Sequence, residues 1–292
     1  MKRSQFLKLC CLGLAMPSGL QCFNSSASSG FSINGSLSSK QTLQYEGRSR
    51  SYLVYTPAPR RTTPSAVVLL LHGHGGSANQ IMGLSGKKAP FRLWMPIADR
   101  ENLILIIPDG LVSPDGKQGW NDARNIDTNP NSDDVGFLTQ LIETVAQSYP
   151  IDLNRIYATG TSNGGQMALR LAAERSKTFA AIAAIIASNP DPIFPKKPQH
   201  PISVMLVNGT KDRFIPYQGG DVIQNRGKVQ STHDSIQYWV DHNECQGTPR
   251  HVQYPNRSRR DRTLASKKTY RNSNTNTEVS LIRILGDRKS VV

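Results

Sequence analysis

The chain has few cysteines and no long apolar run. Three of its four cysteines, Cys10, Cys11 and Cys22, lie near the N-terminus, which leaves Cys245 alone in the rest of the 292 residues. A single cysteine excludes a disulfide framework and a cysteine-based zinc site there. No stretch approaches the roughly 20 consecutive apolar residues that a transmembrane helix needs. The sequence therefore indicates neither a disulfide scaffold nor a membrane-spanning protein.

The N-terminal residues have the pattern of a secretory signal peptide, which we place at residues 1–23. A basic start is followed by the apolar stretch Leu9–Met16 and by small residues. The residues before Cys22 do not resemble a lipoprotein signal, so a lipid anchor is the less favoured alternative. Residues 24–40 are rich in serine and unpatterned, which predicts a disordered linker. We therefore expect a protein secreted to the periplasm or outside the cell, with its folded domain over residues 41–286.

Positive charge is unevenly placed along a chain whose net charge is +14. Basic residues crowd the segment 250–271, and Asp261 alone opposes them there. Such a patch can bind nucleic acid, but no interleaved aromatic pattern or recognition motif accompanies it. We expect a solvated surface loop in this segment and no nucleic-acid partner.

Apolar runs alternate with segments of helical spacing. Ala66–Leu71 and Leu103–Ile107 are continuously apolar, as strands buried on both faces are. Strands that alternate with helices predict an α/β domain with a mostly parallel central sheet and helices on both faces. Further strands are predicted at Ser51–Thr56, Ile156–Thr159, Ala180–Ala187, Ser203–Val207 and Val279–Leu285, and helices over Phe91–Asn102, from Asp133 or Asp134 to Ser148, and over Asp234–His242.

The hexapeptide GTSNGG at 160–165 has the G-x-S-x-G pattern of a nucleophile elbow. It follows an apolar, strand-like run and precedes a helix-patterned segment, which is the context that the motif requires. Glycines are needed there because a Cβ atom would clash where strand and helix cross. The helix N-terminus favours a developing negative charge. Ser162 is therefore the predicted nucleophile of an acyl-transfer reaction, with a chance match as the alternative.

A serine nucleophile needs donors that hold the oxyanion. The segment LHGHGG at 71–76 ends a buried strand and opens a loop of small residues. The backbone N–H groups of His74 and Asn163 form the predicted oxyanion hole. Metal ligation or base catalysis by His72 and His74 is less favoured, because both precede the nucleophile in the chain and provide no complete ligand set.

The acid of a catalytic triad is expected after a later strand. Asp212 follows the predicted strand 203–207 directly and would orient a histidine base. An ordinary turn aspartate is the alternative reading of Asp212, and Asp221 is the reserve candidate for the acid.

Six sequence blocks occur in an order that resembles the secreted polyhydroxybutyrate depolymerase and feruloyl esterase family of α/β-hydrolases (LpqC-like esterases). The resemblance implies an α/β-hydrolase fold and a serine esterase without a metal or organic cofactor. We expect a monomer that acts on a polymeric or oligomeric ester. Trp120, Asn121 and Asp122 would lie near the site, where they either contact substrate or pack the loop. The blocks are residues 71–78, 108–110, 119–122, 133–137, 160–165 and 208–217.

The chain departs from this family at the triad base. The resemblance implies a histidine after the last strand, but Gly286 is followed by DRKSVV, which resembles a translated sequencing adapter. Our hypothesis is a truncation at Gly286 with a non-native tail at 287–292. His233, His242 and His251 follow Asp212 but do not occupy the expected loop. The alternatives are a catalytically dead binding protein of this fold and a serine peptidase of the same fold.

Overall fold

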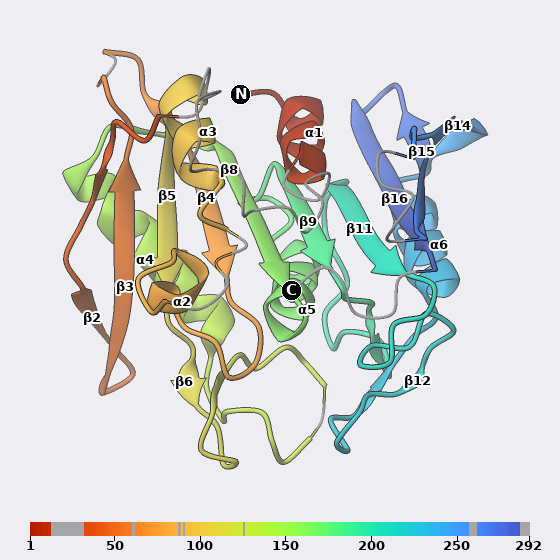
Figure 1. Cartoon of the computed structure of the whole chain (residues 1–292), viewed down its shortest axis with the longest axis horizontal. Coiled ribbons are helices and arrows are strands. Elements are labelled where there is room, and N and C mark those ends of the chain that lie inside the picture. Colours follow the sequence, from red (N-terminus) through yellow and green to blue (C-terminus); the bar gives the residue numbers. More distant parts are fainter. Residues whose placement is uncertain are drawn as a thin grey trace.

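The computed structural model describes residues 1–12, 32–59, 62–86, 89, 91–124, 126–256 and 262–286. In this part of the chain, eleven strands form a central sheet with helices on both faces (Figure 1). The strands of the sheet are β1 (Ser36–Leu37), β2 (Gln41–Tyr45), β3 (Arg48–Thr56), β4 (Ser65–Leu71), β5 (Leu103–Pro108), β8 (Ile151–Thr161), β9 (Ala181–Ile185), β11 (Ser203–Gly209), β14 (Gln246–Gln253), β15 (Leu264–Asn272) and β16 (Thr277–Leu285).

The remaining elements are helices and short two-residue strands. The helices are α1 (Arg3–Leu12), α2 (Ala78–Ile81), α3 (Trp94–Glu101), α4 (Asp134–Ser148), α5 (Asn163–Glu174) and α6 (Thr232–His242). The strands β6 (Leu111–Val112) and β7 (Gln118–Gly119) form a hairpin, and β10 (Pro190–Asp191), β12 (Gly220–Asp221) and β13 (Lys228–Val229) form a small separate sheet.

The middle of the sheet is parallel and its ends are antiparallel. The strand order is β1-β3-β5-β4-β8-β9-β11-β16-β15-β14, with β2 added on β3. All neighbours from β5 to β16 run parallel. The predicted mostly parallel sheet is therefore confirmed. Because parallel strands end at one edge, the segments after β4, β8, β11 and β16 emerge on the same side of the molecule.

The apolar strand β4 shows how the two layers of helices are held. Each of its seven residues is buried. Val67, Leu69 and Leu71 belong to the core beneath α4, α5 and α6. Val68 and Leu70 belong to the opposite core, which α1, α2 and α3 cover. A strand buried on both faces reads as a continuous apolar run, which is why its position was predictable.

The basic segment is not the loop that we predicted. It forms an antiparallel hairpin of β14 and β15 that extends the sheet, with Arg250 opposite Thr269. Lys267 and Arg271 lie on one face of β15, and their nitrogens are 3.6 and 3.4 Å from the Glu278 carboxylate on β16. This pairing neutralises charge that the sequence alone left unopposed. Residues 257–261 lie outside the described residues.

The residues before and after 13–31 contact the rest of the domain. Residues 13–31 themselves lie outside the described part of the chain. In α1 the ring of Phe6 stacks on Tyr157 at 4.6 Å, and the Tyr157 hydroxyl donates to the Met1 carbonyl at 2.8 Å. The signal peptide stays a prediction. The linker prediction was wrong for residues 32–40, because β1 pairs with β3 and Lys40 binds Asp109 at 2.9 Å. A two-residue strand has no periodicity that sequence patterns could reveal. None of the described helices is long and apolar enough to cross a membrane.

Candidate active site at the carboxyl edge of the sheet

Ser162 occupies a strained turn between β8 and α5. Its φ of 53° and ψ of −123° lie where residues other than glycine are rarely found, and such strain is typical of functional sites. A Cβ atom on Gly160 would overlap the Gly164 carbonyl, and one on Gly164 would overlap the carbonyls of Leu71 and His72. The predicted elbow geometry, including its requirement for glycine, is therefore present.

The backbone fixes the serine at the N-terminus of a helix. The Ser162 N–H donates to the Ile185 carbonyl at 2.8 Å, and the Ser162 carbonyl accepts the first intrahelical bond from Gln166 at 2.9 Å. The N–H groups of Asn163 and Gly164 precede that bond, so they have no acceptor within the helix. They supply the positive end of the helix beside the half-buried serine.

The loop after β4 lies against the elbow. A Cβ atom built on Gly73 would be 3.6 Å from Ser162 Cβ and 3.3 Å from the Thr161 carbonyl oxygen. The structure therefore brings together the two segments from which the oxyanion hole was predicted.

His72 is a buried structural residue. Its Nε2 accepts from the Gly110 N–H at 2.9 Å, so its Nδ1 is the nitrogen that donates to the Gly73 carbonyl at 2.7 Å. Burial lowers the pKa of this imidazole, which keeps the ring neutral. With both nitrogens occupied, His72 is unsuited to metal ligation or base catalysis, the two roles that the sequence analysis disfavoured.

The side chain of His74 joins the loop after β4 to the β6–β7 hairpin. Its Nε2 lies 2.8 Å from Asp115 Oδ2, and Arg226 lies 3.6 Å from the same oxygen. Burial lowers the pKa of His74 despite the neighbouring carboxylate. The pKa of Asp115 is also lowered, because bonds from His74 and the Lys117 N–H outweigh its desolvation. Both lowered pKa values are consistent with a neutral His74 imidazole that donates to an ionised Asp115 carboxylate.

Asp212 follows β11 at the same edge as Ser162. Its Oδ1 accepts from the N–H groups of Phe214 and Ile215 at 2.7 and 3.0 Å, and its side chain is half-buried. The strand β9 lies between β8 and β11. Just after the end of β9, the Ile186 N–H donates to the Val207 carbonyl of β11 at 2.8 Å. The reserve candidate Asp221 is exposed on β12.

The contacts described for the three later histidines do not involve the elbow. His242 Nε2 contacts the His200 carbonyl at 3.0 Å, and His200 precedes β11, at the opposite edge of the sheet. His251 is exposed on the terminal strand β14. The His233 side chain is 83% exposed and faces Asp234 at 3.5 Å. Residues 287–292 lie outside the described part of the chain.

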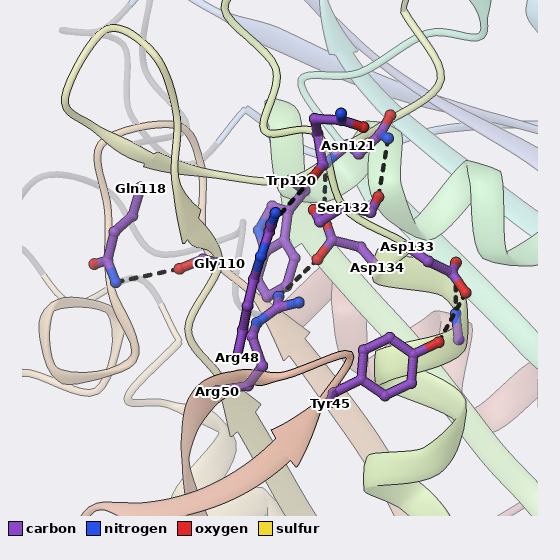
Figure 2. A network of polar contacts seen from close by, with 12 residues as sticks. Tyr45, Arg48, Arg50, Gly110, Gln118, Trp120, Asn121, Ser132, Asp133 and Asp134 are labelled. Atoms are coloured by element: carbon purple, nitrogen blue, oxygen red, sulfur yellow. Dashed lines mark hydrogen bonds and ion pairs between the residues drawn. The ribbon is translucent and has the colours of Figure 1, made fainter.

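The loop 119–122 is held inside the protein. Trp120 and Asp122 are fully buried. The Asn121 side chain donates to the Ser132 carbonyl at 3.0 Å, and its N–H donates to Asp134 at 2.8 Å (Figure 2). Of the two readings of this loop, these contacts favour packing over contact with substrate.

Sequence reasoning missed a charged network beneath this loop. Arg50 on β3 points at Asp134 (Figure 2), and the two pair at 2.6 Å with both side chains buried. The Arg50 guanidinium also covers the Phe137 ring at 3.8 Å. Asp133 caps α4 by accepting from the Gly136 N–H at 2.9 Å, so the predicted cap is confirmed in one of its two positions. Among described residues, no group of three or more His, Cys, Asp or Glu could hold a metal ion.

Comparison with known proteins identifies the family. The phospholipase/carboxylesterase family model matches residues 58–252, which is more than half of the chain. The protein therefore belongs to this family of esterases, and its α/β-hydrolase fold is confirmed.

Curated relatives and a solved structure agree with this assignment. The chain is 32% identical to the putative esterase NocK of Nocardia uniformis over 59% of this chain and 48% of that protein. It is 28% identical to feruloyl esterase D of Neurospora crassa, over 70% and 71% of the two chains. It is 30% identical to a poly(3-hydroxybutyrate) depolymerase of Ralstonia pickettii, over 54% and 33%. The chain thus spans about half of NocK and a third of the depolymerase. An acetyl xylan esterase from Aspergillus awamori superposes with a TM-score of 0.56 at 13% identity, over 86% of this chain and 94% of that one, which supports the fold.

Proposed function

We propose that the protein is a secreted serine esterase in which Ser162 is the nucleophile. The observation that carries the proposal is the strained turn at Ser162, with φ of 53°, at the N-terminus of α5. Ser162 Oγ forms a bond to the ester carbonyl carbon as its proton passes to the base. The N–H groups of Asn163 and His74 hold the oxyanion.

Attack by Ser162 forms a tetrahedral intermediate. Its collapse breaks the bond to the alcohol, which leaves with the proton that the base took from Ser162. Water then attacks the acyl carbon and gives up a proton to the base; the bond to Ser162 Oγ breaks, the carboxylic acid leaves, and the proton returns to Oγ. Asp212 orients the base and stabilises its charged form. No metal or organic cofactor takes part in this scheme.

The base in this proposal is a histidine that follows β16. The strand pairing supports that position, because Ile284 lies opposite Gly209 and the Thr210 N–H donates to the Ile284 carbonyl at 2.9 Å. The Gly286 N–H donates to Thr210 Oγ1 at 3.2 Å. The chain therefore leaves β16 beside the loop that carries Asp212. Resequencing the locus shows which codons follow Gly286, and a natural stop codon in place of a histidine codon would contradict this assignment.

The proposed substrates are polyhydroxyalkanoate oligomers, or feruloyl and acetyl esters on plant polysaccharide. The names of the curated relatives support this range. A serine peptidase is the second candidate function, because the elbow and the oxyanion loop serve both reactions. Parallel assays with p-nitrophenyl acetate, methyl ferulate and a peptide p-nitroanilide separate the two.

A fluorophosphonate label tests the nucleophile. The protein encoded by the resequenced locus is labelled beside Ser162→Ala and a control, Ser85→Ala, whose serine is exposed on the surface. We expect labelling and ester hydrolysis in the wild type and the control. In Ser162→Ala both are lost, with kcat lower by about 10⁴-fold or more. Labelling that survives in Ser162→Ala would refute the nucleophile, and a wild type that neither labels nor hydrolyses esters would favour the binding protein.

A further inference from the structure

We propose that Trp120 is a positioning residue that sets the separation between the two halves of the oxyanion hole. This inference rests on the proposed function. One half is the Asn163 N–H on α5, and the other is the His74 N–H on the loop after β4. Trp120 belongs to neither segment, but it is hydrogen-bonded to both.

The first end of the bridge is the side chain of Asn163. Its Oδ1 accepts from the Trp120 N–H at 2.8 Å, and its Nδ2 donates to the Trp120 carbonyl at 2.9 Å. The same Nδ2 donates to the buried Asp122 carboxylate at 2.6 Å. The residue after the nucleophile is therefore fixed to loop 119–122 by its whole amide group.

The second end of the bridge is the indole ring of Trp120. Its Nε1–H donates to the His72 carbonyl at 2.9 Å, and the centroids of the Trp120 and His72 rings are 5.0 Å apart. His72 is itself fixed by Gly110 and Gly73. The indole thus anchors the strand end from which Gly73 and His74 continue toward the serine.

Burial makes the bridge stiff. Trp120 is 0% exposed and Asn163 is 2% exposed, so water does not compete for these bonds. Arg124 Nη2 donates to the same carboxylate oxygen of Asp122 at 2.7 Å, and Arg124 in turn donates to the Arg226 carbonyl. The bridge is therefore supported by a second layer of charge-assisted bonds.

Rigid spacing matters because an oxyanion hole acts through geometry. Its donors must lie 2.7–3.1 Å from the place where the oxyanion forms, and removing one of them costs about 10²–10³-fold in kcat. Two donors on separate segments keep that geometry only if the segments keep their separation. A buried bridge that does not touch substrate should affect kcat and leave KM nearly unchanged.

The test removes one N–H group from the bridge and compares it with a matched control. Trp120→Phe keeps an aromatic ring but loses the bond to the His72 carbonyl. Trp239→Phe removes the same group from another fully buried tryptophan, whose Nε1 donates to Asn189 at 3.0 Å. Steady-state hydrolysis of p-nitrophenyl acetate gives kcat and KM, and thermal unfolding gives the loss of Tm in each variant.

We expect Trp120→Phe to lower kcat by about 10- to 100-fold, part of the effect of a lost oxyanion donor, with KM within about two-fold. Trp239→Phe should keep its kcat although its Tm falls. Equal kcat values in the two variants, or a Trp120→Phe defect that lies in KM, would overturn the proposal. If Trp120→Phe does not fold, Asn163→Ala releases the other end of the bridge and must show the same loss of kcat. Failure of the proposed function looks different, because hydrolysis would then be absent in the wild type or survive in Ser162→Ala.

Discussion

The imidazole of His74 lies 2.8 Å from the carboxylate of Asp115, and this contact ties the predicted oxyanion loop to the β6–β7 hairpin. Both partners have a lowered pKa. The pair is therefore stable as a neutral imidazole beside an ionised carboxylate. Its response to acid follows from that protonation state.

We predict that acid destabilises the protein in a window that begins near the ordinary histidine pKa of about 6.5. The folded-state pKa values of His72 and His74 lie below this value, chiefly because of burial. The unfolded chain therefore binds more protons as the pH falls, and the stability decreases. Asp115 adds a second loss below about pH 4, because its folded-state pKa is also lowered.

Thermal unfolding between pH 7.5 and 5.5 checks this expectation. His74→Gln should reduce the drop in Tm over that range. The reduction is about 2–4 °C if the substitution removes roughly 1 kcal/mol of the pH-dependent unfolding free energy. Ser85→Ala changes an exposed residue without a titratable group, so it is the control and should leave the pH profile unchanged. A His74→Gln profile parallel to the wild type would contradict the assigned protonation state.

A methyl group at Gly164 should break the elbow. Its Cβ would overlap the carbonyls of Leu71 and His72, which are backbone atoms that cannot rotate away. We expect Gly164→Ala to cost about 3 kcal/mol of unfolding free energy or more, the upper range for overpacking, and to abolish hydrolysis. Urea unfolding measures the cost. Gly116→Ala is the control, because no atom lies within 4 Å of its Cβ, so that only its positive φ of 76° opposes a side chain. It should lose only about 1–2 kcal/mol, and equal losses in the two variants would rule out the steric explanation.

Removing one partner of the buried pair of Arg50 and Asp134 should destabilise the protein strongly. Arg50→Met leaves an uncompensated carboxylate in the interior, which costs about 3–5 kcal/mol. Arg100→Ala is the control, because Arg100 is half-exposed in its pair with Glu101 and should lose at most about 1 kcal/mol. Urea unfolding of the two variants compares them directly. A loss in Arg50→Met no larger than in the control would show that solvent or another cation compensates Asp134.

The central strands and the elbow were predictable because their signals are local. β4 and β5 are continuous apolar runs, and the glycines around Ser162 sit within one turn of the serine. These patterns need no knowledge of distant residues. The prediction of two helix-covered faces followed from the alternation of such runs with helical spacing.

Features that depend on distant partners could not be predicted. Arg50 and Asp134 are 84 positions apart, and the bridge from Trp120 to Asn163 spans 43. The hairpin of β14 and β15 was predicted as a loop because the carboxylate that neutralises Lys267 lies on β16. Each miss involves a polar group whose environment is created only when the chain folds. The base of the proposed triad stays a prediction.

The close approach of Gly160 and Gly164 has a consequence for how this protein could be altered. Backbone atoms of β8 and α5 are in contact at the elbow, so any side chain added there displaces the serine. Directed evolution toward a new ester should therefore accumulate its changes away from the elbow, for example in the turn of the β6–β7 hairpin, where a Cβ atom on Gly116 would meet no atom within 4 Å. Selection experiments should recover glycine at both positions whatever acyl group is demanded.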